Sequence, residues 1–371
     1  MSLFQVDAGR EWRGGQRQSL FLAKELQKKG YDFRYVVQPK SPLHEKASES
    51  GLPVLPIRMA GEFDVFAVLR LAFAMKRRKC RLIHSHDAHS TAIAAAAARF
   101  AGVPIRVISR RVDFPLRDNF FSRLKYRKNV DVIIAISRGV KKVLEDSGID
   151  SSLIKVIPSG TDFSVFSEEG KSDYLRRELG LAEDDFLVGI VAHLADHKGH
   201  KYLIKATKIL REEAPRIKVI IVGEGPLRME LDKLTKDIRV EDMVFFLGFR
   251  ADIPQILASL DLFVLSSYLE GMGSSILDAM ACRLPVVATK VGGIPEVVTH
   301  EKTGLLVTPQ RPKSLADAIL RLYRDRELAS RLGDKGFEIV QRKFSAESMA
   351  QKIIRVYEHV AKNKGIGLAL R

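Results

Sequence analysis

Apolar residues recur along the chain of 371 residues in two alternating patterns, short strand-like runs and longer helical stripes. In the first half, β-branched runs bounded by Gly, Pro or charged residues predict strands. Helices are predicted between them, the first with Leu20, Phe21, Ala23 and Leu26 on its inner side. The predicted strands cover residues 3–6, 35–37, 54–57, 82–84, 105–109 and 132–136, and two further helices cover residues 92–98 and 140–147.

The second half of the chain repeats this alternation. Its predicted strands cover residues 186–191, 219–222, 244–247, 262–265, 285–288 and 305–307. Its predicted helices cover about residues 202–213, 227–236, 253–259, 275–281, 314–324 and 346–362. Because strands that alternate with helices form parallel sheets, the pattern predicts an α/β protein with doubly wound sheets.

The length of the chain favours two domains rather than one. A turn-forming run, PSGTD at residues 158–162, separates the two patterns. We therefore expect an N-terminal domain at residues 1–162 and a C-terminal domain at residues 163–371, both Rossmann-like and facing a cleft. Ligands of such sheets bind beyond the carboxyl ends of the strands.

The composition limits the class of protein further. A hydrophobic share of 46% with 8% aromatic residues excludes intrinsic disorder. Two cysteines, Cys80 and Cys282, exclude a disulfide framework and a four-thiolate zinc site, and they fit a reduced compartment. The first residues lack a signal-peptide pattern, and no run approaches the ~18 apolar residues of a membrane span. We expect a soluble, cytoplasmic protein.

Positive charge is concentrated in the first half. The net charge is +16, and residues 1–162 hold 29 basic and 16 acidic side chains against 32 and 29 in the rest. An anionic partner of the first half is implied, whether nucleic acid, an anionic membrane or an acidic substrate. Residues 69–79 and 120–128 combine apolar residues with cations, as a helix on an anionic membrane does. A core-packing helix with a solvated basic end fits them equally, and no nucleic-acid-binding module is recognised.

One stretch of the second half, residues 266–281, carries candidate chemistry. A buried strand ends in a loop that holds Glu270, Gly271 and Gly273, and a helix begins at about Ser274. Glycines let a ligand approach the backbone, and the first amides of a helix favour an anion such as a diphosphate. Asp278 lies one helical turn further on. The alternative is an ordinary strand–turn–helix with a capping Ser and a solvated Glu.

This stretch and its surroundings resemble a known signature. Glu270 and Asp278 stand at the spacing E-x7-E, followed by PVVAT at residues 285–289 and GGIPEV at 292–297. Collinear motifs are WRGG at 12–15, PSGTD at 158–162, KG at 198–199, VGEGP at 222–226, LGF at 247–249 and GLLV at 304–307. Together they resemble the retaining GT-B glycosyltransferases of family four (glycosyl transferases group 1). The string EWRGGQR at 11–17 is similar to the entry loop of bacterial lipopolysaccharide core glycosyltransferases.

The resemblance implies a hexosyltransferase that uses a nucleotide diphosphate sugar and no cofactor. The sequence contains no Asp-x-Asp, the carboxylate pair with which metal-dependent transferases bring a divalent cation to the diphosphate, so we expect the transfer to be metal-independent. Its donor would bind mainly to the C-terminal domain, with Glu270 near the transferred sugar and Lys198 neutralising the leaving diphosphate. Asp278 replaces the family's second Glu, which holds ribose hydroxyls, and His193 replaces a usual Arg. The donor-binding residues implied are Gly14, Gly15, His193, Lys198, Gly223, Phe249, Glu270, Gly271, Gly273, Ser274, Ser275 and Asp278.

The same resemblance places a saccharide or lipid-linked acceptor on the N-terminal domain and allows the last helix, about 346–362, to pack back onto it. Asp113 is the candidate acceptor-side base. The acceptor-binding candidates are Trp12, Arg13, His86, His89, Arg110 and Arg111. Metal binding by the histidines at 84, 86 and 89 and ordinary salt bridging by the arginines are the alternatives.

The resemblance implies a role in lipopolysaccharide or other cell-envelope polysaccharide synthesis. The donor motifs lie in the nearly neutral half, so the charge of the first half is interpreted as attraction to an anionic bilayer at the inner face of the membrane or to a phosphorylated lipid-linked glycan. The alternatives are a nucleotide-sugar epimerase of the same fold, a phosphorylase, and a basic membrane- or nucleic-acid-binding protein with a decayed site.

Overall fold

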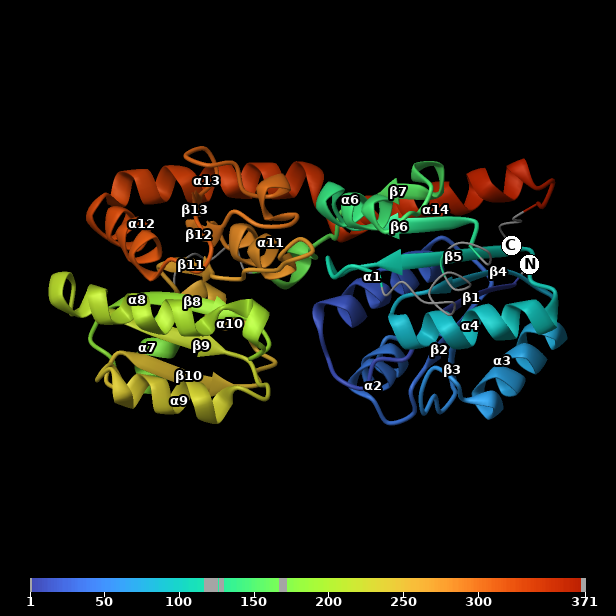
Figure 1. Ribbon diagram of the computed structural model, residues 1–371, viewed down its shortest axis with the longest axis horizontal. Coiled ribbons are helices and arrows are strands. Elements are labelled where there is room, and N and C mark those ends of the chain that lie inside the picture. The colour runs from blue at the N-terminus through green and yellow to red at the C-terminus, as the bar shows by residue number, and fades with distance from the viewer. Residues whose placement is uncertain (1, 117–125, 127–129, 167–171, 368–371) are drawn as a thin grey trace. The chain divides into compact units, whose positions relative to one another are not determined.

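The chain folds into two compact units, shown in Figure 1. The computed structural model describes residues 2–116, 126, 130–166 and 172–367. The first unit comprises Met1–Gly160 and Ala346–Arg371, and the second comprises Thr161–Ser345. The boundary expected at residue 162 therefore lies two residues from the change of unit, and the last helix belongs to the first unit.

The first unit is built on a parallel sheet whose described strands run in the order β3-β2-β1-β4-β5-β6-β7. Strand order reverses between β1 and β4, which pair directly. The strands are β1 (Ser2–Asp7), β2 (Phe33–Val37), β3 (Val54–Pro56), β4 (Cys80–Ser85), β5 (Ile105–Arg110), β6 (Val132–Ala135) and β7 (Ile154–Val156).

Alternating strand residues face two helix layers in this unit. Leu3 and Leu82 join a cluster with α1 and α14, whereas Phe4 and Ile83 join a cluster with α3 and α4. Each layer thereby removes one face of the sheet from water. The described helices are α1 (Gly14–Lys28), α2 (Pro42–Glu49), α3 (Val65–Arg77), α4 (Ala88–Ala101), α6 (Arg138–Asp146) and α14 (Ala346–Asn363).

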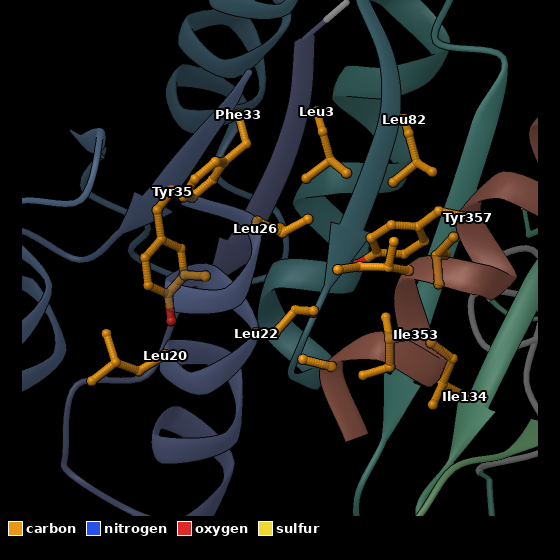
Figure 2. Close-up of a cluster of buried hydrophobic side chains, with 14 of the residues drawn as sticks. Leu3, Leu20, Leu22, Leu26, Phe33, Tyr35, Leu82, Ile134, Ile353 and Tyr357 are labelled. Carbon is orange, nitrogen blue, oxygen red and sulfur yellow. The ribbon is translucent and has the colours of Figure 1, made fainter. Parts of the chain in front are cut away.

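Helix α14 is part of the core of the first unit although it follows the whole second unit in sequence. Figure 2 shows Ile353 and Tyr357 of this helix among side chains of the sheet. The Tyr357 hydroxyl and His84 Nδ1 of β4 form a buried hydrogen bond of 2.5 Å. At the surface, the Tyr31 hydroxyl donates to Glu358 at 2.8 Å. Apolar burial and these polar contacts together hold the helix on the sheet.

The second unit has a parallel sheet with described strands in the order β10-β9-β8-β11-β12-β13. Strand order reverses between β8 and β11. The strands are β8 (Phe186–Val191), β9 (Ile217–Val222), β10 (Val244–Gly248), β11 (Leu262–Leu265), β12 (Val286–Thr289) and β13 (Leu305–Val307). The helices are α7 (Tyr174–Leu179), α8 (His200–Glu213), α9 (Arg228–Asp237), α10 (Ile253–Ser259), α11 (Ser274–Ala281), α12 (Pro312–Arg324) and α13 (Arg326–Lys343).

Four elements, α2, α7, α13 and β7, were not predicted from the sequence. Helix α13 is the longest of them and contains Gly333 and Gly336, which lower helix propensity. The structure gives the reason for Gly333, because a Cβ there would lie 2.1 Å from the carbonyl oxygen of Arg283. Close packing of α13 against the end of α11 thus overrides the local preference.

None of the helices within the described residues is both long and apolar enough to cross a membrane.

Candidate functional site

The second sheet has a point at which the chain leaves two neighbouring strands in opposite directions. Strands β8 and β11 are hydrogen-bonded neighbours, and their carboxyl ends lead into the loops 192–199 and 266–273. Loops that diverge in this way leave room for a ligand between them, so this edge of the sheet is where a ligand is expected. We call these two loops with the first turn of α11 the donor edge.

An ion pair joins the two loops of the donor edge. Lys198 Nζ donates to Glu270 Oε2 at 2.5 Å, and both side chains are largely buried, with 21% and 11% exposed. Ser267 Oγ also donates to Glu270 Oε2, at 3.2 Å. A cation and a carboxylate of opposite charge are therefore held together at the strand ends, in partial shelter from water.

Backbone contacts fix the loops on each other. Ser266 Oγ donates to the carbonyl oxygens of Lys198 and Gly199 at 3.2 and 3.1 Å. The amide of Tyr268 donates to the carbonyl of His197 at 2.9 Å. Gly199 has φ 70°, and a Cβ there would lie 2.1 Å from the carbonyl oxygen of Ser266. Only glycine fits this position, since both the conformation and the close approach exclude a side chain.

The first turn of α11 completes the donor edge. Its N-cap residue is Gly273, with φ 79°, and no side chain of the described residues caps the helix. The helix begins at Ser274, as predicted, and Ser274 and Ser275 are its first two residues, so neither is the capping Ser of the alternative interpretation. The free amides of such a helix start attract an anion.

Asp278 lies one turn further along α11 and is 3% exposed. Its Oδ1 accepts a hydrogen bond of 2.5 Å from Thr161 Oγ1, at the start of the second unit. The shorter side chain thus has a partner inside the protein. The ribose contact implied for Asp278 by the family resemblance remains a prediction.

The other predicted donor residues of this unit lie at strand ends. His193 follows β8 and is half-buried, Phe249 follows β10 and is 53% exposed, and Gly271 is buried in the loop after β11. Gly223 has a packing role, because a Cβ there would lie 2.1 Å from the carbonyl oxygen of Ala192.

Sequence reasoning missed His200, the first residue of α8. It is 2% exposed, and neither ring nitrogen has a hydrogen-bond partner within the described part of the chain. Burial and then the charge of Lys198 lower the pKa of His200 to about 3, so the ring is neutral at physiological pH. A His beside a predicted Lys–Gly motif was the available signal.

The first sheet has a corresponding point between β1 and β4. The amide of Ala8 donates to Asp87 Oδ2 at 2.7 Å, which joins the two strand ends. Asp7, fully buried at the end of β1, accepts from Gln16 Nε2 at 3.0 Å and from Ser19 Oγ at 2.7 Å. Burial, and then the charge of Asp87, raises the pKa of Asp7 to about 6. This polar network was not predicted, although a carboxylate at a strand end was its visible signal.

Helix α1 begins at this edge, and its first residues are Gly14 and Gly15. The N-cap residue is Arg13, whose side chain makes no capping hydrogen bond. Arg13 Nη2 is 2.7 Å from Glu11 Oε2 at the surface. Trp12 is half-buried against the core, with the Lys46 ammonium 5.1 Å from its ring centroid. Trp12 therefore has a packing role in addition to any role in binding.

The predicted acceptor residues differ in their surroundings. His86 is 4% exposed and its Nε2 contacts Gln5 Oε1 at 3.1 Å, and burial lowers its pKa well below the ordinary value. His89, in contrast, is exposed and lies 4.0 Å from Glu62.

Arg110 is the last residue of β5, and Arg111 follows it. Arg110 Nη2 donates to the carbonyl of Phe114 at 2.6 Å. Burial lowers the pKa of Arg111 to about 10, which still leaves the guanidinium charged at physiological pH. Asp113 is 9% exposed. The basic segment 120–128 lies outside the described residues except for Tyr126.

Among the described residues, no group of three or more His, Cys, Asp or Glu side chains is arranged to hold a metal ion. The metal-site interpretation of the histidine cluster therefore gains no support from the geometry. The metal independence of the reaction remains a prediction, which an activity measurement has to test.

Solved structures share the fold. A protein of Anabaena (Alr3699/HepE), solved in complex with UDP and glucose, is 24% identical over 96% of this chain and 99% of its own, with a TM-score of 0.86. The sucrose-phosphate synthase of Thermosynechococcus elongatus is 21% identical over 98% and 100%, with a TM-score of 0.80. The predicted class, two Rossmann-like domains of the GT-B type, is confirmed.

Curated relatives extend over most of the chain. The N-acetyl-α-D-glucosaminyl L-malate synthase of Bacillus anthracis is 25% identical over 92% of this chain and 93% of its own. An Escherichia coli α-1,3-galactosyltransferase, named for UDP-Gal and α-D-GlcNAc-diphosphoundecaprenol, is 28% identical over 85% and 86%.

Two family models match successive parts of the sequence. Residues 12–165 match the model described as Glycosyltransferase Family 4, and residues 171–339 match the one described as Glycosyl transferases group 1. The two matches follow the two units closely and together span most of the chain. With relatives that also match along most of its length, the chain belongs to the GT-B glycosyltransferases composed of these two domains.

Proposed function

We propose that the protein transfers a sugar from a nucleotide diphosphate sugar to a saccharide or lipid-linked acceptor, with retention of anomeric configuration. The role suggested is lipopolysaccharide or other cell-envelope polysaccharide synthesis, at the cytoplasmic face of the membrane. One observation carries the proposal: the Lys198–Glu270 pair lies at the same strand ends as the uncapped start of α11.

The donor edge fits the charge changes of glycosyl transfer. When the bond between the anomeric carbon and the diphosphate breaks, negative charge grows on the diphosphate and positive charge on the sugar. In this proposal Lys198 and the amides at Gly273, Ser274 and Ser275 stabilise the first charge. Glu270 stabilises the second or binds sugar hydroxyls. Phe249 stacks on the base, and His193 supplements Lys198 when it is protonated.

The relatives support a nucleotide-sugar donor. The Anabaena protein was solved with UDP, with UDP-glucose, and with UDP and glucose. The Escherichia coli relative is named for UDP-Gal and for a lipid-diphosphate acceptor, whereas the Bacillus relative is named for malate. These names make uridine sugars the first donors to test and leave the acceptor to be found by experiment.

The proposal is tested with a panel of nucleotide sugars. Purified protein is incubated with each donor, and released nucleotide is measured with and without candidate acceptors. We expect slow, donor-specific release without acceptor and faster release with the right one. An epimerase would change the sugar without releasing nucleotide, and a decayed site would leave every donor intact.

Retention and metal independence need separate measurements. Proton NMR of the first product formed should show the same anomeric configuration as the donor, and an inverted product would exclude retention. Transfer should persist in EDTA, because Lys198 and helix amides are proposed to neutralise the diphosphate. Activity that EDTA abolishes and a divalent cation restores would overturn that part of the proposal.

A further inference from the structure

Helix α3 has an unusual outer face. Ala67, Val68, Leu71, Ala72 and Met75 are buried against the sheet and α4, as expected for the inner face of a helix in an α/β layer. The opposite, solvent-facing side also carries large apolar side chains.

Three large apolar side chains point outward from α3 at spacings of three and four residues. Phe66, Leu69 and Phe73 are 78%, 54% and 68% exposed. Single exposed apolar residues are common, but a row on one helix face marks an interaction surface. In Figure 1, α3 lies beside α4 at the outside of the first unit.

Cations accompany this apolar row. Arg70 and Arg77 lie at spacings of four residues from Phe66 and Phe73 and are exposed. The helix ends in an exposed run of four cations at residues 76–79. Within the described residues, none of these five side chains forms an ion pair. The outer face of α3, defined here as Phe66, Leu69, Arg70, Phe73 and Arg77, therefore combines apolar area with unpaired positive charge.

The loop that leads into α3 contacts the loops at the carboxyl edge of the first sheet. Arg10, in the loop after β1, donates to the carbonyls of Met59 and Ala60 at 3.4 and 3.3 Å. His89, at the start of α4, lies 4.0 Å from Glu62. The apolar end of the outer face thus adjoins the edge at which the predicted acceptor residues lie.

We propose that the outer face of α3 docks on a bilayer containing anionic phospholipid, with its aromatic side chains in the interface and its cations among the headgroups. Docking of this kind needs both apolar area and positive charge, which is why a lipid surface fits this face better than a protein partner. One part of the inference rests on the proposed function: when α3 is docked, a lipid-anchored acceptor in the same membrane can reach the predicted acceptor residues at the carboxyl edge of the first sheet.

Vesicle co-sedimentation tests the proposal. The wild-type protein should bind phosphatidylcholine vesicles that contain phosphatidylglycerol, bind pure phosphatidylcholine vesicles weakly, and dissociate as salt is raised. Phe66→Ser combined with Phe73→Ser, and separately Arg70→Glu combined with Arg77→Glu, should each weaken binding by roughly tenfold or more. Met229→Ser and Lys313→Glu are matched controls at exposed positions of the second unit and should bind like wild type.

Nucleotide release from a soluble donor separates this proposal from the proposed function. The α3 variants should release nucleotide at the wild-type rate, since they leave the donor edge untouched. Normal release without any vesicle binding by the wild-type protein would overturn the docking proposal alone. Self-association of the wild-type protein that Phe66→Ser with Phe73→Ser abolishes, measured by sedimentation velocity without vesicles, would instead assign the face to a protein interface.

Discussion

At the scale of single residues, the donor edge depends on Gly199 as much as on the charged pair. Its backbone lies against Ser266, the first residue of the loop that carries Glu270. The distance between Lys198 and Glu270 is therefore set by a contact in which neither side chain takes part.

Gly199→Ala should destabilise the second unit by about 2 kcal/mol or more, because the added Cβ meets a backbone carbonyl and φ is positive. Urea denaturation measures the loss. Gly61→Ala is the control, since a Cβ there meets nothing within 4 Å. Equal stability of the two variants would contradict the packing described.

Asp7 makes the stability of the first unit depend on pH. Its pKa is raised from 3.8 to about 6, so the folded state takes up a proton at a higher pH than the unfolded chain. The stability from this group is fully present below the unfolded pKa and is lost as the pH rises through about 6. When the pH falls from 7 to 5, the free energy of unfolding of wild type should rise by about 1 kcal/mol relative to that of Asp7→Asn.

Urea denaturation of both proteins at these two pH values measures that difference. A difference in the free energy of unfolding that stays constant between pH 7 and pH 5, or grows in the opposite direction, would exclude the raised pKa.

Residue motifs were predictable where the chemistry is local in sequence. Glu270, Gly273 and Lys198 belong to short motifs, and the structure places them at one sheet edge. Asp7 was missed because the charge of Asp87, which helps to raise its pKa, comes from a residue distant in sequence. His200 was missed because its burial comes from the fold and is not visible in the spacing of a motif.

At the scale of elements, helix α13 shows where sequence patterns are insufficient. Glycine is unfavourable in a helix interior by about 1 kcal/mol relative to Ala. Gly333 and Gly336 nevertheless lie inside α13, where α11 approaches closely. Most strands were predicted because each is a buried β-branched run, whereas this helix depends on a tertiary contact.

Gly333→Ala should therefore destabilise the protein by about 2 kcal/mol, since the backbone carbonyl of Arg283 cannot move aside. Gly336→Ala is the matched variant in the same helix, where a Cβ would lie 3.2 Å from the flexible side chain of Met280. We expect it to be nearly neutral or stabilising, because helix propensity improves. Thermal unfolding of both variants checks this order, and a reversed order would refute it.

At the scale of the whole molecule, the chain crosses from the first unit to the second at Gly160 and returns at Ala346. The PSGTD run marked the first crossing in the sequence. The return had no turn signal of comparable strength, and only the family resemblance indicated it. The core of the first unit is thus completed by the last residues of the chain.

The return of the chain has a measurable consequence. Ile353→Ala in α14 should destabilise the first unit by about 2–4 kcal/mol, because Ile353 is 1% exposed in the core of that unit. Hydrogen exchange should accelerate in β1 and β4 and remain slow in β8 and β11. Ile319→Ala in α12, buried in the second unit, should show the opposite distribution. If Ile353→Ala accelerated hydrogen exchange in β8 and β11 instead, the assignment of α14 to the core of the first unit would be wrong.

The central claim is that the donor edge turns over a nucleotide sugar, and nucleotide release by Glu270→Gln tests it most directly. Once a donor is identified, the rates of wild type, Glu270→Gln and the exposed control Glu241→Gln are compared at equal thermal stability. We predict a loss of about a hundredfold or more for Glu270→Gln and none for the control. Release by Glu270→Gln near the wild-type rate would contradict the account.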